Sequence, residues 1–252
     1  MKNNYWYLIL TTFALWALNE IFYFKPDFFF VSLALAVIII TFYIRALARK
    51  KSEKFWPVYV LTPVLFYLSF SFYSAIIVSQ FWIQAIFLLN AWFIFSYLKN
   101  LYYYFSFGAP ERESRLKRLL VSGAFLSTFA LASNLYGLPI FLSWPFFLLL
   151  IAFMVICLGL FGQFFVFSKN VDREQKIFLG INILVFAEFA GVLFFLPLNF
   201  NILGLMVALV FYFLIMLNDL RVEYRLNFKN VKWPLIILSA VIILTLLSAR
   251  WL

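Results

Sequence analysis

Apolar residues follow one another in long unbroken runs along this chain, and the charged residues gather between the runs. A helix needs about 20 residues to cross the hydrocarbon core of a bilayer. The runs do not alternate apolar and polar residues, as the strands of a membrane barrel would. The pattern predicts an all-α fold, a polytopic transmembrane bundle of about nine helices. We expect these spans at residues 5–23, 28–44, 58–78, 81–98, 117–135, 141–166, 177–196, 201–218 and 234–250.

Short turns separate the predicted helices on one side of the bundle. Connections this short force successive helices to lie antiparallel and side by side. Because no separate polar region interrupts the spans, we predict one integral membrane domain over residues 1–252. The four short turns are expected at residues 24–27, 79–80, 134–139 and 197–199.

Proline and polar residues mark where several helices should begin. Trp-Pro occurs at 56–57, 144–145 and 233–234, each time at a predicted helix start. Proline suits the first position of a helix because the N–H it lacks would have no helical partner there. Before the seventh span, Asp172 and Gln175 have the spacing of a capping box. Pro63, early in the third span, is the only proline placed where it could break the interior of a span.

The composition excludes a soluble protein. The chain of 252 residues is 66% hydrophobic, 23% aromatic and 12% charged, whereas about a quarter of a soluble domain is charged. So much apolar surface requires lipid as its solvent. We therefore expect a multi-pass protein of the cell (inner) membrane, with membrane lipids and other membrane proteins as partners. The single cysteine, Cys157, excludes a disulfide framework, and the lack of histidine removes the commonest general base.

Basic residues lie almost entirely on one side of the predicted bundle. Eighteen of the 20 lysines and arginines precede the first span or follow an even-numbered span, and only Lys25 and Arg250 fall on the other side. The positive-inside rule then predicts a cytoplasmic N-terminus and an external C-terminus. Membrane insertion explains this basicity, so we expect no nucleic-acid partner.

Common catalytic, nucleotide-binding and redox motifs are missing from the sequence. It has no Gly-x-Ser-x-Gly elbow, Walker loop or Cys-x-x-Cys pair. Intramembrane prenyltransferases also have nine spans, and their aspartate-rich loops resemble the Asn-Asp pair at 218–219. The loop after the second span, residues 45–54, has one glutamate where that family needs such a motif, so no family is assigned. We predict no cofactor, no catalytic residue and no metal site.

One cluster of charges is expected at the inner interface, after the eighth span. Its acids and bases alternate along the chain, which favours a salt-bridged helix end over a metal cradle. If the protein were an intramembrane enzyme, this cluster would be the only group of side chains available for catalysis. Its members are Asp219, Arg221, Glu223 and Arg225.

Glu188 is the single acidic residue deep inside a predicted span. It lies in LVFAEFAGVLFF, residues 184–195, about 11 residues into the seventh span and so close to the membrane midplane. An ionised, unpaired carboxylate there costs several kcal/mol, so the group must be protonated or lie beside a cation or water. The small residues Ala187, Ala190 and Gly191 should let another helix come close.

Two hypotheses for Glu188 follow. It is either a neutral side chain that hydrogen-bonds a facing helix, or a proton or cation site in a transport path. Asn90 is the preferred partner because its amide both donates and accepts. Other polar residues expected at the same level are Ser69, Ser71, Ser127, Thr128, Tyr212 and Thr245.

The sequence therefore predicts a class of protein and no specific reaction. We expect a non-catalytic membrane scaffold or the membrane subunit of a larger assembly. The alternative is a small permease or secondary carrier that uses protonation of Glu188. An intramembrane enzyme ranks third.

Overall fold

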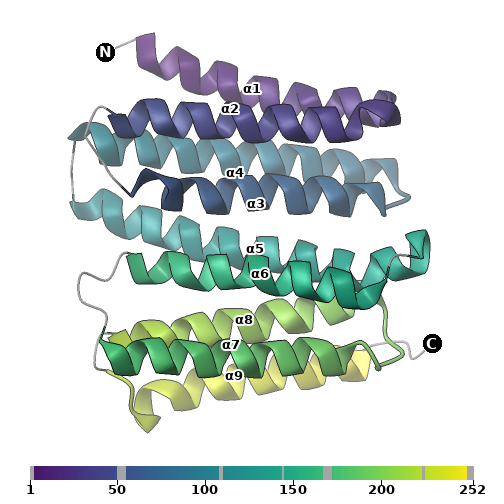
Figure 1. Ribbon diagram of the computed structural model, residues 1–252, viewed down its shortest axis with the longest axis vertical. Coiled ribbons are helices and arrows are strands. Elements are labelled where there is room, and N and C mark those ends of the chain that lie inside the picture. The colour runs from purple at the N-terminus through teal and green to yellow at the C-terminus, as the bar shows by residue number, and fades with distance from the viewer. Residues whose placement is uncertain are drawn as a thin grey trace. The chain divides into compact units, whose positions relative to one another are not determined.

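The computed structural model describes residues 3–49, 55–107, 110–143, 145–166, 172–222 and 225–248. Within these ranges the regular structure is helical (Figure 1). All nine α-helices of the described chain are long and apolar enough to cross a membrane, so the protein is a multi-pass membrane protein. The helices are α1 (Asn3–Phe24), η1 (Pro26–Phe28, a short 3-10 helix), α2 (Phe29–Arg49), α3 (Trp56–Ala75), α4 (Gln80–Phe107), α5 (Pro110–Leu142), α6 (Phe146–Val166), α7 (Arg173–Leu193), α8 (Phe200–Val222) and α9 (Phe228–Ser248).

The predicted turn at residues 134–139 is wrong. Helix α5 continues through Pro139 to Leu142, and the chain turns at Ser143, whose φ of 53° lies in the left-handed region. Proline removes one hydrogen bond from a helix interior and weakens it. Burial outweighs that loss here, because Leu135 and Tyr136 are almost fully buried on the helical face.

Two of the three Trp-Pro pairs lie in described helices, one at the start of its helix and the other in the interior. Helix α3 begins at Trp56, as predicted. The prediction for Trp233-Pro234 is wrong, since α9 begins at Phe228 and Pro234 lies inside it. The Asn227 side chain accepts a hydrogen bond from the backbone N–H of Asn230, which starts the helix earlier than proline would. Trp144 lies outside the described residues.

The helices form two compact units, residues 1–127 and 128–252, and α5 contributes to both. The single domain predicted from the sequence stays a prediction. In unit 1 (residues 1–127), α1 packs against α2 and α4, and α3 packs against the same two helices. The Phe66 and Phe93 rings stack in its core with centroids 3.8 Å apart. Gly123 brings α5 against this core, where a Cβ would meet Phe93 and Thr62.

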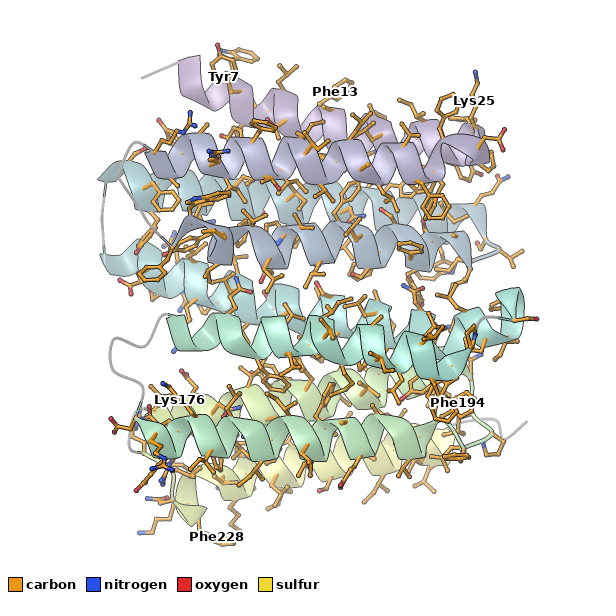
Figure 2. The ribbon with its side chains drawn as sticks, in the orientation of Figure 1. Tyr7, Phe13, Lys25, Lys176, Phe194 and Phe228 are labelled. Carbon is orange, nitrogen blue, oxygen red and sulfur yellow. The ribbon has the colours of Figure 1, made fainter. Side chains whose placement is uncertain are left out.

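Unit 2 (residues 128–252) is built around α8, which packs against α6, α7 and α9. Gly204 lets α8 approach α5 so closely that an added Cβ would overlap the Ser133 side chain. Helix α9 packs on α8 and has no buried residue in its described span. Figure 2 shows Lys176 and Phe228 at one end of this unit and Phe194 at the other.

Candidate functional site

Polar contacts fix the rotation of α7 about its axis along the first half of the helix. The backbone N–H of Asp172 donates to Gln175 Oε1 at 3.1 Å, so the predicted capping box is confirmed. Further along, the Asn182 side chain donates to Asn218 Oδ1 on α8 at 3.0 Å. Asn182 and Asn218 are both buried, so this bond ties α7 to α8 inside an apolar region.

Aromatic contacts fix the same rotation of α7 along the second half of the helix. The Phe186 ring is fully buried and lies 5.6 to 5.8 Å, centroid to centroid, from three other rings of unit 2. The Tyr136 hydroxyl of α5 donates to the Ala190 carbonyl at 2.7 Å. Helix α7 therefore has a fixed inner face. The three rings around Phe186 are Phe153, Phe161 and Phe211.

Glu188 lies on the opposite face of α7 and is exposed. At 3.6 residues per turn, its side chain points away from the side that carries Phe186 and Ala190. Among the described residues, none forms a hydrogen bond or an ion pair with its carboxyl group. Exposed apolar side chains surround it along the helix, so a carboxyl sits at the centre of an apolar outer face. We call this the Glu188 face, and it consists of Ile177, Ile181, Leu184, Glu188, Val192 and Phe195.

The helix bounds shift Glu188 along α7 relative to the sequence prediction. Helix α7 ends at Leu193, three residues before the expected end of the seventh span. Glu188 is the sixteenth of 21 residues, about 7.5 Å before Leu193 at 1.5 Å per residue. It therefore lies as far from Leu193 as from Ile183, the middle residue of the helix. Phe194, Phe195 and Leu196 continue the apolar sequence beyond it.

Asn90 is buried in unit 1, whereas Glu188 belongs to unit 2. Neither the amide oxygen nor the amide nitrogen of Asn90 has a hydrogen-bond partner in the described structure. The pairing of Asn90 with Glu188 stays a prediction. Of the other polar residues expected at this level, Ser69, Ser71, Ser127 and Thr128 are buried, Tyr212 is 47% exposed, and the Thr245 hydroxyl donates to the Val241 carbonyl at 2.7 Å.

At the predicted inner interface, Arg221 forms an ion pair with Glu174 of α7 at 2.9 Å. Glu174 was not among the predicted members of this cluster, because it lies 47 positions before Arg221 in the sequence and only the fold brings the two together. The Arg225 carbonyl accepts a hydrogen bond from the Asn230 side chain at 2.7 Å, which ties the start of α9 to the preceding loop. Asp219 precedes them on α8, and Glu223 lies outside the described residues.

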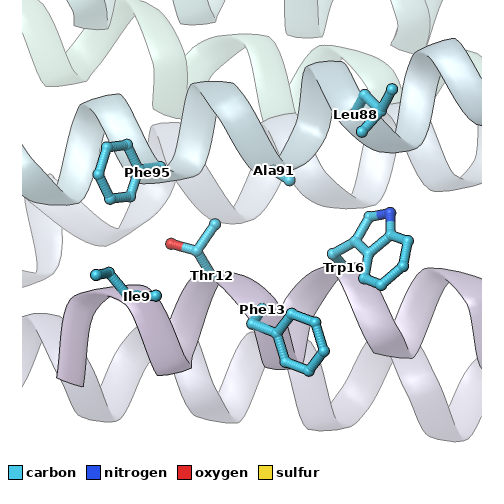
Figure 3. Close-up of a pocket in the computed structure, with 7 residues that line it drawn as sticks. All are labelled: Ile9, Thr12, Phe13, Trp16, Leu88, Ala91 and Phe95. Carbon is cyan, nitrogen blue, oxygen red and sulfur yellow. The ribbon is translucent and has the colours of Figure 1, made fainter. Parts of the chain in front are cut away.

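A groove runs between α1 and α4 in unit 1 (Figure 3). Its volume is about 250 Å³, and its walls are almost entirely apolar. The Thr12 hydroxyl of this groove donates to the Leu8 carbonyl of its own helix, so its O–H is not available to a ligand. The groove suits hydrocarbon and not a polar solute. Seven residues line it: Ile9, Thr12, Phe13, Trp16, Leu88, Ala91 and Phe95.

No protein-family model, curated protein or solved structure matches this chain. Among the described side chains, the exposed carboxyl group on the Glu188 face has the greatest need of a hydrogen-bonding partner.

Proposed function

We propose that the protein is a non-catalytic membrane scaffold or the membrane subunit of a larger assembly. One observation carries the proposal, namely that Glu188 is exposed at the centre of an apolar outer face of α7. Lipid chains offer a carboxyl group no hydrogen-bond partner, whereas a second protein does. A polar side chain in this position favours an interface between proteins over a surface that only contacts lipid.

Exposed apolar side chains alone would not support the proposal. Helix α9 exposes many of them, among them Trp233, Ile237 and Leu244, and lipid covers such a surface as well as protein does. The Glu188 face differs from α9 because it contains a group that lipid cannot satisfy. The proposal therefore depends on α7.

The alternative is a small permease or secondary carrier that uses protonation of Glu188. Such a carrier needs a polar, water-accessible cavity beside the carboxyl group. The described groove is apolar and lies in unit 1, so it supplies no support for this alternative. Buried Asn90, with its two unpartnered amide atoms, would be the first residue to test in a carrier.

The mass of the particle in native membrane discs tests the proposal. One copy has a mass of 29.7 kDa, and we expect wild-type discs to contain additional protein mass. The Glu188→Leu variant should shift the particles toward one copy, whereas Leu244→Ala on α9 should not. Wild-type discs that hold only one copy, with no other protein, would contradict the proposal.

We also propose that the N-terminus lies in the cytoplasm and the C-terminus outside, in the cell (inner) membrane. The basic residues around the connections from even-numbered to odd-numbered helices support this orientation. In a Cys157→Ala background, a membrane-impermeant maleimide added to intact cells should label Ser143→Cys and leave Asn227→Cys unlabelled. The reverse pattern would overturn the orientation.

A further inference from the structure

Three fully buried side chains of unit 1 carry polar atoms that have no hydrogen-bond partner among the described residues. They are the amide nitrogen of Asn19 on α1, both amide atoms of Asn90 on α4 and the hydroxyl of Ser127 on α5. A buried amide without a partner is costly, so such groups bond to protein or to ordered water. We propose that unit 1 binds water between α1 and α4, where a water molecule bridges Asn19 and Asn90.

Asn90 faces the interior of unit 1, between α1 and α3. Phe87, one turn before it, contacts Phe22 of α1 with ring centroids 5.4 Å apart. Phe93, one turn after it, stacks on Phe66 of α3 at 3.8 Å. Residues three apart lie on the same side of a helix, so the Asn90 amide lies between these two aromatic contacts.

Asn19 faces the same interior from α1. The Ser71 hydroxyl of α3 donates to Asn19 Oδ1 at 3.3 Å. One turn earlier, the Tyr67 hydroxyl of α3 donates to the Leu15 carbonyl of α1 at 3.0 Å. These two bonds join α1 to α3 and leave the Asn19 amide nitrogen as the polar atom still to be satisfied.

The two asparagine side chains lean toward each other. Helices α1 and α4 run in opposite directions, because Gln84 donates to Glu20 at 3.3 Å and, one turn further along, Leu88 and Trp16 line the same groove (Figure 3). Counted from these contacts, the two asparagines lie about 7.5 Å apart along the helix axes. A helical side chain leans toward the start of its own helix, so in an antiparallel pair the two amides converge. They do not bond each other directly, and a separation of this kind fits one bridging water.

The unpartnered atoms suit a neutral molecule that both donates and accepts. The amide nitrogens of Asn19 and Asn90 offer N–H donors, whereas Asn90 Oδ1 offers an acceptor. A cation would face the N–H groups, and an anion would face the carbonyl oxygen. Water satisfies both kinds of group at once, and the Ser127 hydroxyl can extend the network because it also donates and accepts.

Polar side chains connect this site to one end of unit 1. Glu20 directly follows Asn19 and lies four residues before Phe24, the last residue of α1. Its partner Gln84 is only partly buried, as is Glu20 itself. Water therefore enters the site past this pair, from the end of α1 that is followed by exposed Lys25.

Solid-state NMR of the protein in lipid bilayers tests the site with water itself as the probe. Asparagine labelled with ¹⁵N reports the transfer of magnetisation from water to each side-chain amide, and loss of a signal in Asn90→Leu identifies Asn90. Buried Asn218 is the matched control, because its nitrogen donates to the Leu214 carbonyl and its oxygen accepts from Asn182. We expect transfer to Asn90 to be several-fold faster than transfer to Asn218.

A double-mutant cycle tests whether Asn19 and Asn90 share the water. Asn19→Leu and Asn90→Leu should each lower the folding equilibrium constant in bicelles about five- to thirty-fold, because each leaves the opposite amide without a partner. The double variant should fold about as well as either single variant, since the shared water is lost only once. Asn100→Leu on α4, whose side chain donates to the Ser96 carbonyl at 2.8 Å, is the control, and its effect should multiply with that of Asn19→Leu.

Three results would overturn the inference. Transfer from water to Asn90 that is no faster than transfer to Asn218 would mean that the site is dry. A higher folding equilibrium constant for Asn90→Leu would mean that the amide has no partner at all. Effects of Asn19→Leu and Asn90→Leu that simply multiply would exclude a shared water. None of these results bears on what covers the Glu188 face, because they concern unit 1.

Discussion

The buried polar side chains of this protein differ in whether they have partners. Asn182 donates to Asn218, and Asn218 in turn donates to the Leu214 carbonyl of its own helix at 2.9 Å. The two amides therefore form a short chain of hydrogen bonds between α7 and α8. Because no water competes inside an apolar bundle, this chain fixes the rotation of α7 and, with it, the direction in which Glu188 points.

The contribution of this pair is measurable with a double-mutant cycle. Asn182→Ala and Asn218→Ala should each destabilise the folded protein, with a coupling free energy of about 0.5–1.5 kcal/mol, as for other interhelical hydrogen bonds. Reversible unfolding in bicelles gives the four stabilities. Leu184→Ala combined with Asn218→Ala serves as the uncoupled control. Strictly additive effects of the two asparagine substitutions would mean that the bond does not stabilise the fold.

The sequence reveals that Glu188 is unusual, but it does not reveal which way the side chain points. A soluble helix shows its buried face through an amphipathic pattern. Helix α7 has apolar residues on all sides, so its inner face is set by partners distant in the sequence, such as Tyr136 and Asn218. The bond between Tyr136 and Ala190 joins residues 54 positions apart, and no local pattern predicts it.

At the scale of whole helices, glycines decide where the elements approach each other. Gly204 on α8 faces the Phe129 carbonyl and the Ser133 backbone nitrogen of α5, which would lie 3.0 and 2.9 Å from an added Cβ. Backbone atoms cannot move aside as the tip of a flexible side chain can. The contact between α5 and α8 therefore requires glycine at this position.

Gly204→Ala should destabilise unit 2 by about 1–3 kcal/mol, the usual cost of overpacking. The matched substitution, Gly162→Ala on α6, adds its methyl group to open space and should change stability little. Thermal unfolding of the two variants in the same detergent measures the difference. If both variants unfold at the same temperature, the close approach of α5 and α8 is incorrect.

Helix positions were predictable from the sequence, whereas several helix ends were not. Each predicted span falls mainly on one observed helix, because the length of an apolar run depends only on local composition. The ends at Leu142 and Phe228 were missed, since they depend on the burial of Tyr136 and on the Asn227 cap. Pro63, which is placed where it could interrupt its span, lies inside the continuous helix α3, and Pro139 and Pro234 also lie inside helices, because proline is tolerated within a membrane helix.

In the molecule as a whole, a multi-pass bundle presents a proposed interface on one of its helices. Apolar composition makes the protein a membrane protein, and contacts within unit 2 orient α7. That orientation exposes Glu188 among apolar side chains. We therefore propose that protein, and neither lipid nor water, covers the Glu188 face in the membrane.

The accessibility of a spin label beside Glu188 shows what covers this face. In a Cys157→Ala background, a nitroxide at Leu184→Cys is compared with one at Leu244→Cys in native membranes. We expect the label at position 184 to be shielded both from oxygen, which dissolves in lipid, and from a water-soluble nickel complex, whereas the label at position 244 should be open to oxygen. Equal access of oxygen to both labels, or access of nickel to position 184, would contradict it.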